Sequence, residues 1–254
     1  MIKIKSAEEI AVLKEGGHIL SLILDELEKL VVPGNSTLDV DDLAMELMEV
    51  YKVEPMILGY HPKFAPRPYP AATCVSINDI LVHGIPNEAP EIFEEGDVVS
   101  IDCVIGYKGL IVDSARTVGA GVLSKEAKGL IHITKKALEV GISAARPGNH
   151  IVDIARAIEK VVPKEYGIVE TFCGHGVGFD LHEEPAVPNF VTNEKSPLIV
   201  PGMVIAIEPM LTLGSKEVVV LNDGYTVVTE DGSLSAHVEH TVAITEDGPL
   251  VLTK

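Results

Sequence analysis

The 254-residue chain contains no tryptophan and only three cysteines, Cys74, Cys103 and Cys173. The number of cysteines is odd, and none of them forms a C-x-x-C pair. This pattern argues against a disulfide framework and is typical of proteins from a reducing compartment. We therefore expect a cytoplasmic protein, and a chain of this length can bury a substantial hydrophobic core.

Positive charge is also scarce. The chain has 20 Lys and Arg residues against 38 Asp and Glu residues, which gives a formal net charge of −18. Such an excess of acid repels polyanions and disfavours nucleic acid or an anionic membrane as a direct partner. The apolar run nearest the start, residues 19–24, is too short to cross a bilayer. We expect no membrane segment.

Turn signals and hydrophobic periodicity divide the chain into helices and short strands. A capping-box pattern from Ser6 to Glu9 opens a helix that continues to about Leu30. Further helices are predicted at 38–51, 125–145 and 151–162, and strands at 73–77, 98–106, 110–117, 203–208, 217–221, 225–229 and 236–244. The pattern predicts a mixed α/β (α+β) fold.

The sequence contains a weak internal repeat with an offset of 114 residues. Pro-Gly-Asn occurs at 33–35 and again at 147–149, and each copy is followed by an aspartate, Asp39 or Asp153. We interpret the repeat as a duplication within one domain, residues 1–254. Its two pseudo-symmetric halves are expected to share one sheet, with helices covering a face.

Two acidic residues face each other in a predicted hairpin. The segment 106–109, Gly-Tyr-Lys-Gly, lies between two apolar runs and indicates a turn. With the turn centred between Tyr107 and Lys108, Asp102 pairs directly with Asp113 on one face of the sheet. Like charges so placed are destabilising unless a cation lies between them or one is protonated. A shifted register with two unrelated acids is the alternative, and we favour a metal site.

Two further acids, Glu208 and Glu239, occupy segments that otherwise read as apolar strands. A carboxylate buried in such a strand is costly unless it is paired or metal-bound. With Asp102 and Asp113 they supply four negative charges, which match two divalent cations, and His175 adds a neutral nitrogen. Oxygen-rich ligation with one imidazole suits cobalt, manganese, iron(II) or zinc. Two such ions can activate a hydroxide and polarise a carbonyl or phosphoryl group.

Five segments resemble those of type I methionine aminopeptidases. They are VHGIP (82–86), VSIDCVIGYKGLIVDSA (99–115), FCGHGVGFDLHEEP (172–185), PGMVIAIEPM (201–210) and SAHVEHT (235–241), in the same order and over nearly the whole chain. The resemblance implies the pita-bread fold, in which pseudo-two-fold halves form a curved, mostly antiparallel sheet covered by helices. It also implies a hydrolase that removes N-terminal methionine and prefers a small second residue.

The resemblance assigns a dinuclear metal site to Asp102, Asp113, His175, Glu208 and Glu239. By that resemblance Asp102 chelates one ion, Asp113 and Glu239 bridge the pair, and His175 and Glu208 complete the coordination of the second ion. Glu208 is also expected to relay a proton from the attacking water to the leaving amine.

The same resemblance assigns substrate contacts to two histidines and to an apolar pocket. His182 is expected to stabilise the developing oxyanion, and His83 to donate to the amide nitrogen of the substrate. An apolar pocket suits a thioether, and Tyr69, Cys74, Leu181 and Tyr60 match its positions, although each is also compatible with plain core. The other histidines, His18, His61, His132, His150, His237 and His240, are expected to be structural.

Three features depart from the family pattern. A proline-rich insertion at 62–68 replaces a short glycine connection, Phe179-Asp180 stands where an arginine is common, and Tyr225 stands where tryptophan is frequent. These differences bear on substrate range and affinity, while the residues expected to carry the chemistry are unchanged.

Other functions remain open from the sequence. One alternative is an Xaa-Pro aminopeptidase or prolidase of the same fold, although Met210 stands where that branch usually has glycine. A non-catalytic binding relative is a second, and metal analysis would separate it. Spacing alone also allows a dinuclear phosphatase, but the motifs lack a nearby basic cluster for phosphate.

The expected partners follow from the expected reaction. The substrates are the N-termini of nascent, deformylated polypeptides, because a free amine is expected to ligate a metal ion. A transient association with the ribosome is possible in this family, but the acidic composition gives it no support. We expect a monomer.

Overall fold

The computed structural model describes residues 1–63, 65–193 and 195–254, so Phe64 of the proline-rich insertion lies outside the described residues. The helices within these ranges are α1 (Ala7–Leu27), the short 3-10 helix η1 (Glu28–Leu30), α2 (Thr37–Tyr51), α3 (Lys125–Ala144) and α4 (Ile151–Val161). All four α-helices predicted from the sequence are confirmed, with small differences at their ends.

Side-chain caps explain where the first two helices begin. The Ser6 Oγ accepts from the Glu9 N–H, and the Glu9 carboxylate accepts from the Ser6 N–H at 2.7 Å. Ser36 and Asp39 form the same reciprocal pair at the start of α2. Each capping box satisfies backbone donors that have no partner inside the helix.

Within the part of the chain that the structure describes, the strands pair in four antiparallel sheets. The first sheet has the order β1 (Glu54–Pro55), β4 (Val98–Tyr107), β2 (Thr73–Ile77), and β5 (Leu110–Gly119) also pairs with β4. The second has the order β13 (Ser235–His237), β10 (Met210–Thr212), β6 (Gly167–Ile168), and the third has the order β11 (Val218–Val220), β12 (Val227–Thr229), β3 (Ile80–Val82). The fourth has the order β15 (Gly248–Val251), β14 (His240–Thr245), β9 (Val204–Ile207), β7 (Gly174–Gly176), β8 (Glu183–Val187). The predicted shared sheet is therefore divided into four hydrogen-bonded parts.

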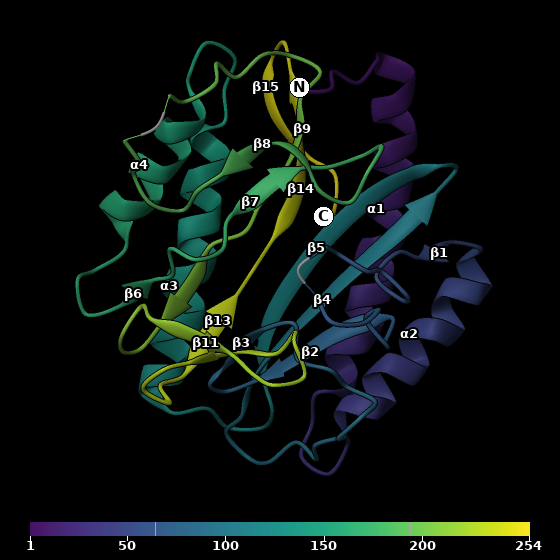
Figure 1. Ribbon diagram of the computed structural model, residues 1–254, viewed down its shortest axis with the longest axis vertical. Helices are drawn as coiled ribbons and strands as arrows, with labels where there is room; N and C mark the ends of the chain where they lie inside the picture. The colour runs from purple at the N-terminus through teal and green to yellow at the C-terminus, as the bar shows by residue number, and fades with distance from the viewer. Residues whose placement is uncertain (64, 194) are drawn as a thin grey trace.

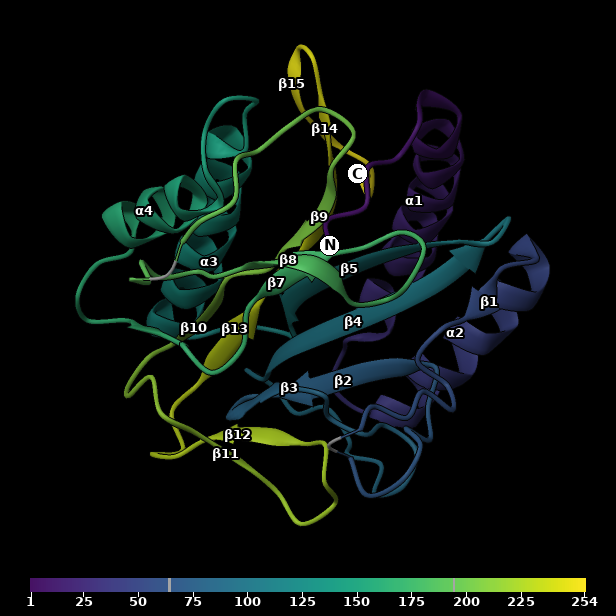
Figure 2. The same cartoon turned by 45° about the horizontal axis from the view of Figure 1, so that its top comes forward.

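Two helix pairs lie at opposite sides of the strands (Figure 1). Helix α1 packs on β4 and β5 and α2 packs on β2, whereas α3 packs on β9, β10 and β13 and α4 packs on β8. In Figure 2 the long hairpin of β4 and β5 crosses the centre of the molecule, next to β13 and β14. Both termini lie near β9 and β14 in this view.

Hydrogen bonds repeat between the halves with the 114-residue offset predicted from the sequence. The Asn35 side chain donates to the Leu30 carbonyl at 3.0 Å, and the Asn149 side chain donates to the Ala144 carbonyl at 2.9 Å. Helices α2 and α4 also begin at residues 37 and 151, which have the same separation. The duplicated, pseudo-two-fold architecture is confirmed.

The register of the first hairpin differs from the prediction. Asp102 pairs with Ala115, and Asp113 pairs with Val104, so the two aspartates are diagonal neighbours and not direct partners. The reason is the turn: Lys108 (φ 50°) and Gly109 (φ 80°) form a two-residue loop, which moves the centre of the hairpin one position along the chain. Because the shift in pairing is two residues, both aspartates keep the same face.

The second half contains a comparable pair of strands, interrupted in the middle. Ile207 pairs with His240 and Met210 pairs with His237, a register that places Glu208 opposite Glu239. The ladder breaks there because the next residue, Pro209, has no N–H to donate. Each half therefore contributes two acids from an antiparallel pair.

The two halves meet where β5 lies against the β13–β14 segment. The Glu239 N–H donates to the Ala115 carbonyl at 2.9 Å, and the Ser114 hydroxyl donates to the Glu239 carbonyl at 2.8 Å. The Thr241 hydroxyl accepts from the Asp113 N–H at 3.0 Å and bonds the Asp113 carbonyl at 2.7 Å. These bonds fix the acids of one half beside those of the other.

Among the helices of the described residues, none combines the length and the apolar character needed to cross a bilayer.

Candidate metal centre and substrate cavity

The four acids predicted from the sequence lie around one cavity of about 400 Å³. Asp102 comes from β4, Asp113 from β5, and Glu208 and Glu239 from the interrupted ladder of the second half. Asp113 is 5% exposed, Glu208 is 8% exposed and Glu239 is 2% exposed. Carboxylates at this depth need a compensating cation or a proton.

His175 lies in β7 between two glycines that are required for close approach. A Cβ at Gly174 would lie 2.3 Å from the Ala206 carbonyl oxygen, and a Cβ at Gly176 would lie 2.4 Å from the Glu184 carbonyl oxygen. Neighbouring backbone thus passes over both glycines, and only the histidine projects a side chain. The alternating glycines bring this short strand close enough to place its imidazole beside the acids.

The imidazole of His175 is oriented for ligation. Its Nδ1 lies 2.9 Å from the Gly176 carbonyl oxygen and can only donate to it, which leaves the lone pair on Nε2. Nε2 lies 3.5 Å from Glu208 Oε1 and 3.8 Å from Asp113 Oδ2. A backbone acceptor on the other ring nitrogen is the usual arrangement behind a metal-binding histidine.

Buried oxygens without partners mark the centre of the cluster. Asp102 Oδ1, Asp113 Oδ1 and Glu239 Oε1 are buried and accept no hydrogen bond within the described structure. Burial and the neighbouring carboxylates raise the pKa of Asp113 and the pKa of Glu239 well above their ordinary values. Burial also raises the pKa of Asp102.

The donor set fits divalent metal. Asp113, His175 and Glu239 each offer a ligand atom, and these atoms lie within 4.8 Å of one another. Glu208 and Asp102 stand next to them, so oxygen donors predominate and one imidazole is present. This composition suits a hard or borderline divalent ion and not a thiolate-bound zinc.

His182 lies beside His175 and lines the same cavity. Its ring centroid is 4.5 Å from that of His175, and its Nδ1 lies 3.0 Å from the Tyr60 hydroxyl. Loss of solvation and the nearby His175 lower the pKa of His182 to about 4, so the ring is neutral at pH 7. The Tyr60 hydroxyl can donate to Nδ1 or accept from it, and in the tautomer in which it donates the ring proton is on Nε2.

His83 lines the same cavity. It has a left-handed backbone conformation, with φ of 59°, which is uncommon for a residue other than glycine. Burial and the nearby His237 lower the pKa of His83 to about 4. The imidazole is therefore neutral at pH 7 and can donate one hydrogen bond.

The four residues predicted for an apolar pocket lie together. Tyr60, Tyr69, Cys74 and Leu181 all line the cavity. The Tyr69 ring meets the Tyr225 ring edge-on, with centroids 5.0 Å apart. The structure therefore places the four predicted pocket residues on the wall of the cavity that contains the acids.

The residues that flank the proline-rich insertion, Tyr60 and Tyr69, both line this cavity. The Tyr69 N–H donates to the Tyr60 carbonyl at 2.9 Å, which closes the base of the loop. The Tyr225 hydroxyl donates to the Arg67 carbonyl at 2.5 Å, and Pro62 lines the cavity. Described residues of the insertion therefore border the cavity that contains the acids.

The cavity lining also includes residues that were not assigned to the site from the sequence, and among them His237 contacts the acids. His237, expected to be structural, lines the cavity with 2% exposure, and its Nε2 lies 3.5 Å from Glu208 Oε2. The sequence did contain a signal for this position: His237 lies two residues before Glu239, and in an extended chain these two side chains point to the same face. By contrast, His240 bonds the Thr253 hydroxyl away from the cavity lining, as expected of a structural histidine.

Comparison with known proteins places this chain among metallopeptidases. Residues 11–246 match the model of metallopeptidase family M24. The chain is 46% identical over 257 residues to a methionine aminopeptidase of Aquifex aeolicus, covering 100% of this chain and 99% of the relative. It is 40% identical to methionine aminopeptidase 1 of Bacillus subtilis, with 100% of both chains covered.

Solved structures agree with the fold. A methionine aminopeptidase from Thermotoga maritima superposes with a TM-score of 0.94 at 40% identity, with 100% of both chains covered. A prolidase from Pyrococcus furiosus superposes with a TM-score of 0.74 at 23% identity, and the match covers 99% of this chain but 65% of the prolidase. At 23% identity, the similarity to the prolidase shows a shared fold and nothing more.

Proposed function

Since the chain belongs to metallopeptidase family M24, we propose that it is a methionine aminopeptidase, which hydrolyses the first peptide bond of proteins that begin with methionine. The observation that carries the proposal is a cluster of buried carboxylates in the wall of a cavity of about 400 Å³ that is also lined by apolar side chains. Full-length similarity to methionine aminopeptidases supports it.

We propose that two divalent ions bind per chain, chosen from cobalt, manganese, iron(II) and zinc. Asp102 would hold one ion, Asp113 and Glu239 would be shared by both ions, and His175 and Glu208 would complete the coordination of the second ion. When bound, the ions supply Lewis-acid chemistry, which polarises the scissile carbonyl and makes water a nucleophile at neutral pH.

Glu208 is placed to move the proton. Its Oε1 faces His175 and its Oε2 faces His237, so the carboxylate lies at the edge of the metal-ligand cluster. We assign it two transfers: it accepts the proton of the attacking water and donates a proton to the leaving amine. The Glu208→Gln variant cannot accept that proton and is expected to fold but lose nearly all turnover.

His182 and His83 act on the scissile peptide bond. With its proton on Nε2, His182 donates to the carbonyl oxygen, and this bond strengthens as negative charge develops there. His83 donates to the amide nitrogen of the same bond. Tyr60 contributes by bonding His182 Nδ1, which selects the tautomer that can donate.

The apolar wall selects the first side chain. A thioether offers shape and polarisability but almost no hydrogen bonding, so packing against Tyr69, Cys74 and Leu181 is the available means of recognition. The preference for a small second residue would arise from crowding beyond these residues, near the metal ions.

The proposal also covers the domain organisation of the chain, its oligomeric state, its location and its substrates. The whole chain, 1–254, would act as one catalytic domain and as a monomer in the cytoplasm. Its substrates would be the free N-termini of deformylated nascent polypeptides, with at most transient contact to the ribosome.

The test is turnover on a Met-X-Ser peptide panel, varying X and the added divalent metal. Met-Ala-Ser should be cleaved, Met-Leu-Ser cleaved far more slowly, and Xaa-Pro peptides left intact. An acetylated Met-Ala-Ser should resist, because it has no free amine to ligate a metal. Cleavage of Xaa-Pro peptides in preference to Met-Ala-Ser would favour the prolidase branch, and absence of both activities would favour a binding protein.

A further inference from the structure

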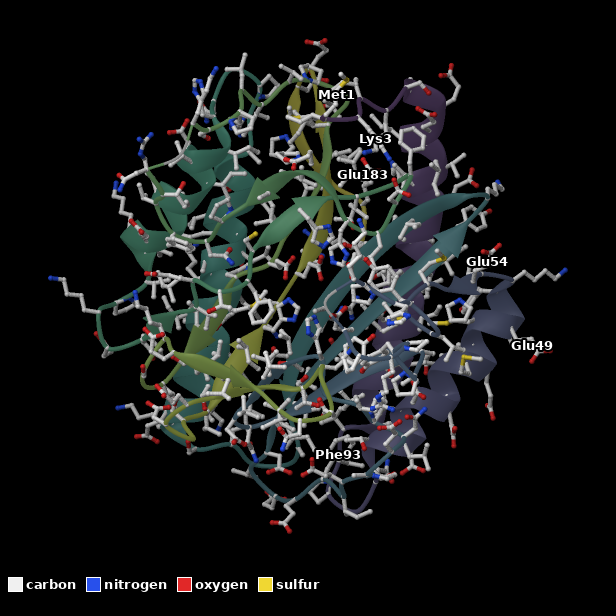
Figure 3. The ribbon with its side chains drawn as sticks, in the orientation of Figure 1. Met1, Lys3, Glu49, Glu54, Phe93 and Glu183 are labelled. Atoms are coloured by element: carbon white, nitrogen blue, oxygen red, sulfur yellow. The ribbon has the colours of Figure 1, made fainter. Side chains whose placement is uncertain are left out.

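The first six residues, here called the N-terminal segment, precede α1 and contact the loop 178–183 through Lys3 and Lys5. Lys3 and Ile4 are exposed, but Lys5 is only 3% exposed. In Figure 3 the labelled Lys3 and Glu183 lie close together near Met1. A buried lysine in an otherwise exposed terminal segment requires a partner.

Two glycines leave room for the segment. The Lys5 N–H donates to the Gly202 carbonyl at 2.8 Å, and a Cβ at Gly202 would lie 2.9 Å from the Lys5 carbonyl oxygen. A Cβ at Gly178 would lie 2.6 Å from Lys5 Cε. Both glycines have positive φ, 87° and 136°, so their conformation and their lack of a side chain suit this close packing.

The partner of Lys5 is Glu183. The Lys5 ammonium lies 2.7 Å from Glu183 Oε2, and both side chains are 1% exposed. The other carboxylate oxygen accepts the backbone N–H groups of Phe179 at 2.6 Å and Asp180 at 2.9 Å. Glu183 therefore closes the loop 178–183 on itself and joins it to the N-terminal segment. Loss of Lys5 would remove the buried cation of this carboxylate and leave it only the more distant, 41% exposed Lys3, whose ammonium lies 3.8 Å from Glu183 Oε1, which is unfavourable.

This loop carries two cavity residues, Leu181 and His182. Within the described structure, the imidazole of His182 makes one side-chain hydrogen bond, to the Tyr60 hydroxyl at the rim. The position of the ring therefore depends mainly on the backbone of the loop. Glu183, the next residue, is the anchor of that backbone.

We propose that Lys5 is a positioning residue: its buried ion pair with Glu183 holds the loop 178–183 so that His182 meets the scissile carbonyl. This rests on the proposed function, because it assumes that His182 acts on the substrate. Lys5 itself does not line the cavity; its side chain bonds Glu183 and the Lys3 carbonyl.

The experiment compares Lys5→Met with Lys3→Met. Lys3 is the matched control, since its ammonium also pairs with this loop, through Asp180 and at 3.8 Å from Glu183 Oε1, but its side chain is 41% exposed. Lys5→Met should lower kcat for Met-Ala-Ser about 10-fold or more, with a smaller change in KM, because the contact of His182 matters most in the transition state. Lys3→Met should stay within about 2-fold of the wild type, as expected for an exposed ion pair.

A cycle with His182→Ala separates positioning from plain stability. In the His182→Ala background, Lys5→Met should have almost no further effect on kcat, since there is no imidazole left to position. The same fold loss in both backgrounds would overturn the proposal. The double variant Lys5→Met/Glu183→Gln removes both buried charges, tests the same ion pair if the single variant folds poorly, and should show the same dependence on His182.

A readout without turnover keeps this test distinct from that of the proposed function. In the long-range proton–nitrogen spectrum of the metal-free protein, the His182 ring signals should shift or broaden in Lys5→Met and stay unchanged in Lys3→Met. Unchanged His182 signals in Lys5→Met would contradict the positioning role. A wild type without peptidase activity, or a fully active His182→Ala, would instead contradict the proposed function.

Discussion

Replacing Gly176 with alanine is expected to lower kcat/KM for Met-Ala-Ser about 100-fold, because it displaces His175. The new Cβ would lie 2.4 Å from the Glu184 carbonyl oxygen, whereas ordinary contacts begin at 3.4 Å. The obstacle is backbone, so β7 and β8 must separate by about 1 Å, and a shift of that size in a catalytic site can cost about 10²-fold in rate. Overpacking of this kind also costs about 1–3 kcal/mol of stability.

The assay for Gly176→Ala is peptide turnover together with thermal unfolding and metal affinity. The matched control is Gly129→Ala in α3, where the nearest atom to the new Cβ is the Tyr166 hydroxyl at 3.0 Å. That change should leave turnover unaltered, and its gain in helix propensity of about 0.5–1 kcal/mol should be offset in part because the Tyr166 hydroxyl must shift by a few tenths of an ångström. If Gly176→Ala kept wild-type kcat/KM and metal affinity, the close-approach explanation of the glycines around His175 would be wrong.

Three further predictions follow from single features of the structure. Tyr60→Phe removes the hydroxyl that bonds His182 and should lower kcat about 5-fold, the equivalent of one ordinary hydrogen bond of about 1 kcal/mol; an unchanged kcat would show that the tautomer is set otherwise. Metal removal should destabilise the protein more at pH 7.5 than at pH 5. The folded metal-free state raises the pKa of Asp113 and the pKa of Glu239, so stability from their protonated forms is lost as pH rises above the ordinary carboxyl range. Thermal unfolding with and without chelator checks this, and a larger chelator effect at pH 5 would contradict it. Asp41→Ala removes the acceptor of three hydrogen bonds at the start of β2 and should cost about 3 kcal/mol in urea unfolding; a loss below about 1 kcal/mol would mean that water replaces it.

The sequence predicted the members of the acidic cluster but not their pairing. Alternation along the strands placed Asp102 and Asp113 on one face, and an error of two residues in the register could not change that. The register itself depended on which two residues formed the turn, and the left-handed conformation of Lys108 is uncommon enough for a lysine that composition did not reveal it.

The close contact between the halves was beyond the sequence. Thr241 bonds the backbone of Asp113 across 128 residues, and no local pattern encodes such a contact. The same limit explains why His237 was assigned a structural role, because its neighbour Glu208 is distant in the chain. The 114-residue repeat, by contrast, was readable because each half uses the same Pro-Gly-Asn break and the same asparagine bond.

The most direct test of the central claim is calorimetric titration of the metal-free chain with Mn²⁺ or Co²⁺, with proton release recorded. We predict two ions bound per chain, with release of protons as the carboxyls ionise. Both sites should be lost in Asp113→Asn/Glu239→Gln and retained in the exposed control Glu246→Gln. Binding that is absent from the wild type, or unaltered in the cluster variant, would contradict the assignment of these buried acids to metal.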